Sequence, residues 1–303
     1  MDKDYLKQFS NENVEKLLLQ PSAIPILEDI LNREINLYSK LKDKRLNFGK
    51  VPSPQELFPL LEETKPEVDE FLGVSEIKNP GIQYHSQNEN ILLLSLGIGI
   101  SGGIGSYAIT KGLYFGFEAL DYVFIATSLF ISAFGSAGIY YNNTRPSEYS
   151  PEKGISLKKQ KRELIIPVIA HEYTHHVQKE KGFPYEKFEC LREGQARSVQ
   201  NAIALKWMEE DNPSSLCGNI VYNLPEVRSV YFWSAEKNRR TPNPYLCEEQ
   251  ESKYDKFLRD RLRKQGKPTE HALGNAFFST LEAREGTGIH KEIMAGRYQL
   301  PSF

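Results

Sequence analysis

Two runs of about twenty residues that carry no charge limit what this chain can fold into. Residues 91–110, ILLLSLGIGISGGIGSYAIT, and residues 122–141, YVFIATSLFISAFGSAGIYY, contain no Asp, Glu, Lys or Arg, although these types make up 26% of the 303 residues. A helix of about twenty apolar residues is long enough to cross a bilayer. Because the link between the runs is short, the pattern predicts a transmembrane helical hairpin over residues 91–141.

The residues that flank the two runs predict an orientation for this hairpin. Aromatic residues gather at the ends of both runs, as at a membrane interface, and basic residues follow residue 144, which predicts a cytoplasmic side there. We therefore expect contact with membrane lipid and polar portions in the cytoplasm. The alternative is a soluble cytoplasmic protein whose glycine-rich runs form a buried core, because Ser, Thr and Gly dilute both runs.

Composition argues against nucleic acid as a principal partner. The chain has 38 basic and 40 acidic residues, a formal net charge of −2, and so lacks the cationic field typical of nucleic-acid-binding proteins. Cys190, Cys217 and Cys247 are odd in number and form no CxxC pair, which favours a reducing compartment over a disulfide framework. The first thirty residues are too charged for a secretory signal peptide.

Outside the hairpin the chain divides into predicted helices and a few short strands. Apolar residues at a spacing of three to four favour a helical N-terminal segment over 1–48, and Gly73 is expected to end a helix pair that begins near residue 51. The other predicted elements are a strand within 74–86, a turn and strand within 148–159, and helices over 192–210 and 270–286. The predicted parts of the chain are 1–48, 49–90, the hairpin 91–141, and 142–303.

Residues 171–175 form the pattern H-E-x-x-H within the apolar segment IIPVIAHEYTHHVQ, where Pro167 is expected in the first turn of a helix. His171 and His175 are about one helical turn apart, so both imidazoles can face one metal ion. Glu172 lies about 100° round the helix from His171 and can address a metal-bound water without being a ligand. His176 lies about 100° round from His175, which predicts a supporting or packing role.

Glu193 is the strongest candidate for a third metal ligand. It lies in LREGQARSVQ, on the predicted helix that follows the motif. A catalytic zinc ion keeps three protein ligands and a water, and two histidines with a glutamate are a known set. An isolated H-E-x-x-H can arise by chance, but the downstream glutamate favours one catalytic Zn²⁺ at His171, His175 and Glu193. Arg197 is expected either to orient that carboxylate or to form an ordinary surface ion pair.

The two motifs together resemble a known family of enzymes. H-E-Y-T-H at 171–175 followed by E-G-Q-A-R at 193–197 is similar to the gluzincin metallopeptidases, and among them to the minigluzincin-like group, whose third ligand lies in an E-G-x-A-R motif. A tyrosine commonly follows the arginine in that group, where this chain has Ser198. The resemblance implies an α+β fold, namely a mainly helical zincin-like metallopeptidase domain with a small sheet, into which the apolar hairpin is inserted.

The resemblance implies a zinc endopeptidase that hydrolyses peptide or protein substrates. The basic residues after residue 144 predict that its catalytic domain lies in the cytoplasm. Zinc lowers the pKa of its water to about 7, and Glu172 acts as the general base and passes the proton to the leaving amine. The developing oxyanion also needs a hydrogen-bond donor. The candidates for that role are His271, which ranks first, and His290, Tyr222 and Tyr245.

Two other functions also fit these residues. One is a non-catalytic zincin-fold protein with a regulatory or scaffolding role, against which the presence of Glu172 argues, because a site without turnover does not need that carboxylate. The other is a latent enzyme, in which residues 1–48 or a C-terminal segment occupy the cleft.

Overall fold

A computed structural model describes the chain at residues 2–42, 49–85, 146–184, 188–209, 214–246 and 253–301. The chain forms two compact units, Met1–Gln83 with Glu148–Phe303, and Tyr84–Ser147. The helices are α1 (Lys3–Leu6), α2 (Asn11–Leu18), α3 (Ala23–Lys42), α4 (Leu57–Leu72), α7 (Arg162–Glu180), α8 (Glu189–Glu209), α9 (Ser214–Lys237), α10 (Lys253–Gln265), α11 (Glu270–Glu285) and α12 (Ile289–Met294). The strands are β1 (Ile82–Tyr84), β2 (Glu148–Ser150) and β3 (Gly154–Leu157).

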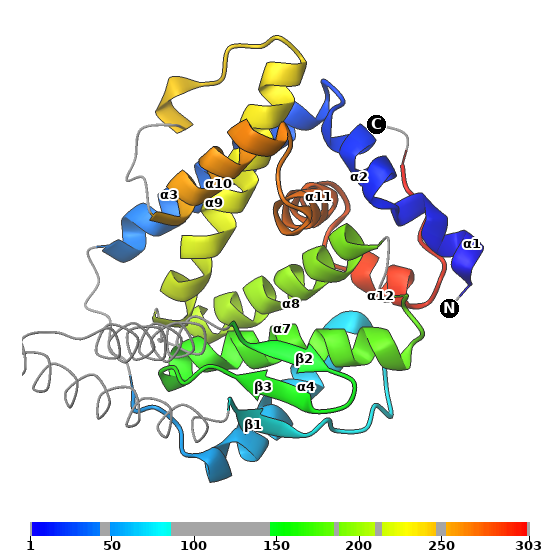
Figure 1. Cartoon of the computed structure of the whole chain (residues 1–303), viewed down its shortest axis with the longest axis vertical. Helices are drawn as coiled ribbons and strands as arrows, with labels where there is room; N and C mark the ends of the chain where they lie inside the picture. Colours follow the sequence, from blue (N-terminus) through cyan, green and yellow to red (C-terminus); the bar gives the residue numbers. More distant parts are fainter. Residues whose placement is uncertain are drawn as a thin grey trace, which may run out of the picture. The chain divides into compact units, whose positions relative to one another are not determined.

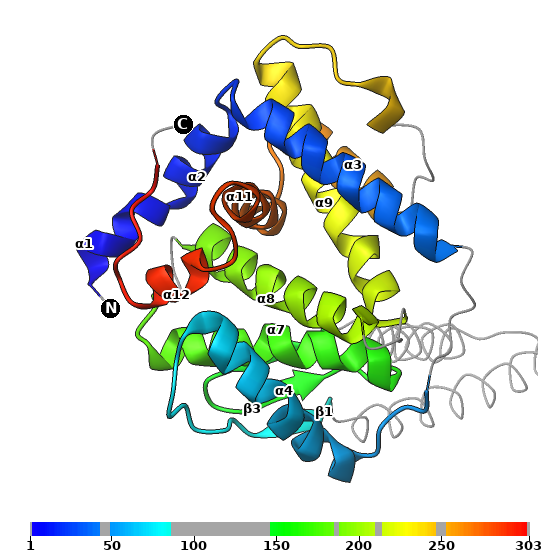
Figure 2. The same ribbon diagram turned by 180° about the vertical axis from the view of Figure 1, so that it is seen from behind.

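Three helices stack on one another at the centre of the first unit. α8 packs on α7 along one side and on α11 along the other, and both views of the ribbon show it between them (Figures 1 and 2). α4 and the strands β2 and β3 contact α7 on its remaining side. Because Tyr173 of α7 and Phe277 of α11 are almost fully buried, these helices derive their stability from burial of apolar surface.

The ends of several helices agree with the sequence pattern. α11 begins after Thr269, whose hydroxyl oxygen accepts a 3.1 Å hydrogen bond from the N–H of Ala272, and it ends at Gly286, as predicted. α4 ends at Gly73, whose φ of 65° is the left-handed conformation that glycine adopts without strain. A short 3₁₀ turn, Pro54–Glu56, stands in place of the first helix of the predicted pair.

The start of α7 differs from the prediction. α7 begins at Arg162, so Pro167 lies inside the helix and not in its first turn. A proline inside a helix removes one backbone hydrogen bond. Ile165, Ile166 and Ile169 around it are almost completely buried, and this burial offsets the lost bond.

The three strands form one small sheet in the order β1-β3-β2. The strands predicted within 74–86 and 148–159 are confirmed, and the second region folds into an antiparallel hairpin in which Tyr149 is opposite Ile155. Ile155 donates its N–H to the carbonyl oxygen of Gly81 at 2.7 Å, on the β1 side. β2 is therefore an edge strand, and it contacts α7.

The N-terminal helices pack in the same unit as the predicted metal site. α2 contacts α11 and α8, and α3 contacts α9. Asn11 of α2 accepts a 3.1 Å hydrogen bond from the backbone N–H of Cys190, in the first turn of α8. The side chain of Gln8 also joins the two ends of the chain, since it donates to the oxygen of Tyr298 at 3.1 Å and accepts from the N–H of Leu300 at 2.9 Å.

The transmembrane hairpin in the predicted fold requires correction. Within the described residues, no helix is long and apolar enough to cross a membrane. The described helices of sufficient length, α3, α7, α8 and α9, all carry several charged side chains, as expected of helices that pack on a protein core along one face only. The transmembrane helix of the predicted fold is therefore not found in the described part of the chain. Residues 91–141, on which it was placed, lie outside the described residues.

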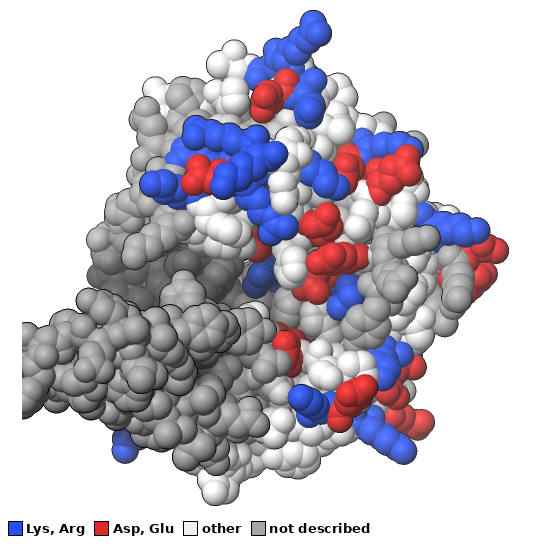
Figure 3. All heavy atoms as spheres, viewed as in Figure 1, with Lys and Arg blue, Asp and Glu red and all other residues white. Residues whose placement is uncertain are grey.

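One face of the molecule carries charged side chains of both signs (Figure 3). On the face shown in Figure 3, Lys and Arg gather over α10, and Asp and Glu are frequent on the neighbouring surface. The charge distribution on this face is therefore mixed.

A variant lacking residues 1–48 tests whether the N-terminal helices regulate the protein or stabilise it. The removal exposes apolar surface that α2 and α3 cover and removes the bond from Asn11 to α8, so we expect it to abolish cooperative unfolding or lower Tm by more than about 10 °C. Circular dichroism during heating measures the change. A truncated protein with unchanged Tm and raised activity would contradict the structural role and support latency.

Candidate metal centre

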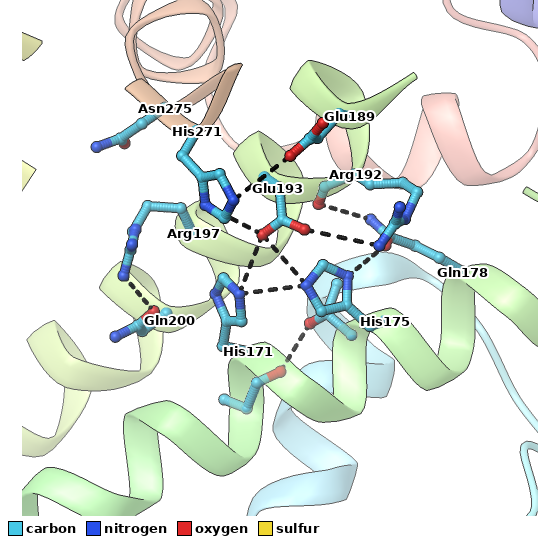
Figure 4. A network of polar contacts seen from close by, with 12 residues as sticks. His171, His175, Gln178, Glu189, Arg192, Glu193, Arg197, Gln200, His271 and Asn275 are labelled. Atoms are coloured by element: carbon cyan, nitrogen blue, oxygen red, sulfur yellow. Dashed lines mark hydrogen bonds and ion pairs between the residues drawn. The ribbon is translucent and has the colours of Figure 1, made fainter. Parts of the chain in front are cut away.

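α7 presents two histidines to one point because of its helical repeat. His171 and His175 are four positions apart, and their Nε2 atoms lie 3.2 Å from each other. The ring centroids are 4.8 Å apart and the ring planes are nearly perpendicular, at 88°. Both imidazoles therefore direct the same nitrogen toward α8 (Figure 4).

Glu193 of α8 completes the cluster. Its Oε2 atom lies 3.5 Å from Nε2 of His171 and 3.4 Å from Nε2 of His175. One ligand atom from each of the three residues lies within 4.8 Å of the others. The three side chains are 12%, 7% and 11% exposed, in chain order, so the cluster lies mostly in the interior.

The donor atoms fit a zinc ion. Two imidazole nitrogens and one carboxylate oxygen are three electron-pair donors of the kinds that zinc binds, and a catalytic zinc keeps one further position for water. Nδ1 of His175 lies 3.0 Å from Oε1 of Gln178, which can only accept a hydrogen bond. Nδ1 therefore carries the proton, and in the neutral ring Nε2 has a free electron pair for a metal.

Hydrogen bonds from Gln178 fix its own orientation. Its Nε2 donates to the carbonyl oxygen of Arg192 and to Oε1 of Gln195, both at 3.1 Å, so it joins α7 to α8 beside the ligands. Nδ1 of His171 is buried and has no hydrogen-bond partner among the described residues. The two ligating histidines thus differ in their support, since only the ring of His175 is anchored at its second nitrogen.

Burial and mutual charge set the protonation of the metal-free cluster. Burial lowers the pKa of His171 to about 4. Burial also acts to lower the pKa of His175, but the negative charge of Glu193 overcomes it, so this pKa lies above its usual value. Burial acts to raise the pKa of Glu193, but the charge of His175 and hydrogen bonds from both histidines hold it well below its usual range. In the metal-free cluster these effects favour a proton on His175, next to the carboxylate of Glu193.

Glu172 lies beside the ligands, buried against the sheet. Its side chain is buried, and burial is the largest of the effects that raise its pKa to about 7. Its carboxylate accepts a hydrogen bond from the backbone N–H of Tyr149 in β2, and it is close enough to His175 and Glu193 to interact with their charges. Glu172 is therefore a carboxyl group that can hold or release a proton near neutral pH.

His271 reaches the same cluster from α11. Its Nδ1 lies 3.4 Å from Oε2 of Glu193, and its Nε2 lies 3.6 Å from Oε1 of Glu189, one turn earlier on α8 (Figure 4). The His271 side chain is 47% exposed. It is therefore close to the metal ligands and still accessible to a bound molecule.

Two glycines allow α11 to lie this close to α8. A Cβ atom on Gly274 would lie 2.2 Å from the carbonyl oxygen of Cys190, and one on Gly194 would lie 2.3 Å from the oxygen of Gly274. Only backbone without side chains fits at this crossing. Gly194 follows Glu193 directly, and Gly274 lies one turn after His271, so the crossing brings His271 to Glu193.

The other residues named from the sequence lie in different surroundings. Arg197 donates to Gln200 at 2.8 Å and to the buried Glu226 of α9 at 3.3 Å, so it supports the contact of α8 with α9. His290 is buried between Phe71 and Phe278, with Nε2 2.7 Å from Glu282. Tyr245 is 82% exposed. The side chain of Tyr222 lies outside the description.

Several residues around the metal centre were not predicted from the sequence. Gln178 follows His175 by three positions on the same helical face, a spacing that could have revealed it. Tyr149 has no local signal, because its approach to Glu172 depends on how the hairpin packs on α7. Glu226, which accepts hydrogen bonds from Arg197, Tyr254 and Asn275, likewise depends on tertiary packing.

The chain matches no family model, no curated protein and no solved structure. The gluzincin resemblance therefore depends on residues 171–175 and 193–197 alone. It supports a proposal and not a family assignment.

Replacing Gly274 by alanine tests the close helix crossing. The added methyl group meets backbone atoms that cannot turn aside, so we expect Gly274→Ala to lower the free energy of unfolding by about 1–3 kcal/mol. Gly288→Ala is the matched control, since a Cβ there meets nothing within 4 Å; a change within about 0.5 kcal/mol is expected. Urea unfolding measures both, and equal effects would contradict the crossing.

Zinc titration against a competing chelator tests the donor set. We expect one zinc ion per chain, with affinity reduced on the order of 100-fold or more in His171→Ala or Glu193→Ala, because each removes a ligand. His85→Ala is a control, since that imidazole bonds to the backbone oxygen of Pro146. Unchanged affinity in both ligand variants would rule out this centre.

Proposed function

We propose that the protein is a zinc-dependent metallopeptidase that hydrolyses peptide bonds. The observation that supports this most strongly is the convergence of Nε2 of His171, Nε2 of His175 and Oε2 of Glu193. The buried Glu172 beside them is the second. A metal site that served structure alone would have no need of a free carboxyl group at this place.

His171, His175 and Glu193 would hold the ion. When bound there, zinc would supply a Lewis acid that polarises the scissile carbonyl and acidifies a water molecule. The hydrogen bond from His175 to Gln178 keeps the electron pair of Nε2 directed at the site. The close packing of α8 on α7 holds Glu193 opposite both imidazoles before any ion arrives, so little reorganisation accompanies binding.

Glu172 would transfer the proton that hydrolysis requires. Its carboxylate accepts a proton from the attacking water and gives it to the nitrogen of the leaving amine, so that one carboxyl group serves as base and then as acid. A group whose pKa is raised to about 7 suits both tasks near neutral pH. The bond from the N–H of Tyr149 holds this carboxylate in position.

His271 would assist from α11. Its side chain is 47% exposed and lies next to Glu193, so it can donate a hydrogen bond to the oxygen that gains negative charge during the attack. Oε1 of Glu189 lies 3.6 Å from Nε2, and Nδ1 is the ring nitrogen that faces the metal ligands, 3.4 Å from Oε2 of Glu193. The similarity of residues 171–175 and 193–197 to the minigluzincin-like group supports the same reaction, with Ser198 as a departure from the pattern.

Glu172→Gln tests this function. The substitution keeps the size of the side chain and removes its ability to take a proton, so we expect kcat for peptide hydrolysis to fall on the order of 100-fold or more. Zinc affinity should remain within about threefold, because Glu172 is not a ligand. A set of fluorescence-quenched peptides with the zinc-loaded protein measures the rate.

Glu163→Gln is the matched control for this variant. Glu163 is a second buried glutamate of α7, and it binds the backbone N–H of Gly49 at 2.9 Å and 3.0 Å. Its replacement should leave kcat within about twofold, since it takes no part in proton transfer. Equal rates for wild type and Glu172→Gln would contradict the proposed role.

A further inference from the structure

His176, the third histidine of the segment, connects three parts of the chain around Glu172. Its Nε2 lies 2.7 Å from the carbonyl oxygen of Lys78, in the segment before β1, and its Nδ1 lies 3.0 Å from the hydroxyl oxygen of Tyr149 in β2. His176 is buried, and the rings of His176 and Tyr149 meet at 65° with centroids 5.4 Å apart. It therefore fixes α7 to β2 and to the segment that leads into β1.

The hydrogen-bond partners of this imidazole determine which of its two nitrogens carries a hydrogen atom. A carbonyl oxygen only accepts, so Nε2 of His176 carries a proton and donates it to Lys78. In the neutral ring Nδ1 is then an acceptor, and the hydroxyl group of Tyr149 donates to it. The result is a directed chain of hydrogen bonds from Tyr149 through His176 to the backbone.

The backbone N–H of Tyr149 points away from β3, as its hydrogen bond to Glu172 requires. Ile155, opposite Tyr149 in the hairpin, donates its own N–H to Gly81 on the β1 side. Tyr149 and Ile155 therefore form a pair whose backbone groups do not hydrogen-bond to each other. The N–H of Tyr149 points to the outer edge of the sheet. That N–H is the group that donates to the carboxylate of Glu172.

We propose that His176 and Tyr149 are positioning residues for Glu172, an inference that rests on the proposed function. The hydroxyl of Tyr149 is held by α7 through His176, and its backbone N–H in turn holds the carboxylate on the same helix. The edge strand is thus fastened to α7 at the residue that orients the general base. Both bonds have to be present for the carboxylate to keep one orientation.

Tyr149→Phe tests this role with the least disturbance, because it removes one hydroxyl and keeps both the ring and the backbone N–H. We expect kcat to fall on the order of 10-fold or more with KM unchanged, since the base is less well placed while substrate binding is intact. Zinc affinity should be unchanged. Tyr298→Phe is the matched control, because it removes a buried hydroxyl that bonds to Glu285 at 3.0 Å in the C-terminal part of the chain.

Hydrogen exchange of the amide at position 149 in the metal-free protein gives a second measurement. We expect exchange to be slow in the wild type and at least about tenfold faster in Tyr149→Phe, because the strand edge is released from α7. His176→Phe should produce the same two changes, and His176→Gln, which can still donate to Lys78, should recover part of the rate.

The outcomes separate this inference from the proposed function. If the wild type cleaves peptides but Tyr149→Phe retains full kcat or unchanged amide exchange, the positioning role is overturned and the proposed function stands. If the zinc-loaded wild type cleaves no peptide, the proposed function is wrong, and the expected effect of Tyr149 and His176 on kcat is wrong with it. A lower Tm without a change in kcat would assign the two residues to stability alone.

Discussion

The packing of α8 on α7 determines the rest of the site, because it places Glu193 opposite two imidazole nitrogens in the interior. Burying three electron-pair donors that face one another costs free energy unless a proton or a cation lies among them. In the metal-free protein the charge of Glu193 raises the pKa of His175 and so favours a proton there, whereas burial lowers the pKa of His171 and favours its neutral form. A bound cation would replace the proton and satisfy all three donors together.

The surrounding elements act on this centre through a small number of contacts. Asn11 binds the first turn of α8 shortly before Glu193, and the glycine crossing of Gly194 and Gly274 brings α11 and His271 to the same carboxylate. On the opposite side, the sheet approaches α7 through Tyr149. The ligands thus lie between two supports, one made of helices and one made of a strand edge.

The part of this arrangement that depends on local spacing could be predicted from the sequence. The four-residue interval of His171 and His175 and the helix that carries Glu193 follow from helical periodicity, and the ends of α4 and α11 follow from glycines. A supporting or packing role for His176 was predicted from helical geometry, but its partners Tyr149 and Lys78 were not, since they come from segments that only tertiary packing brings together. The transmembrane hairpin was inferred from the length of two runs that contain no charged residue. The long helices that the structure describes are buried against other helices.

X-ray absorption at the zinc edge of the zinc-loaded protein tests the metal centre most directly. The account predicts a first shell of nitrogen and oxygen at about 2.0–2.1 Å, with the scattering of two imidazole rings and no sulfur. The imidazole signal should fall to one ring in His175→Ala. A shell that contains sulfur at about 2.3 Å, or no imidazole, would contradict the assignment of His171, His175 and Glu193.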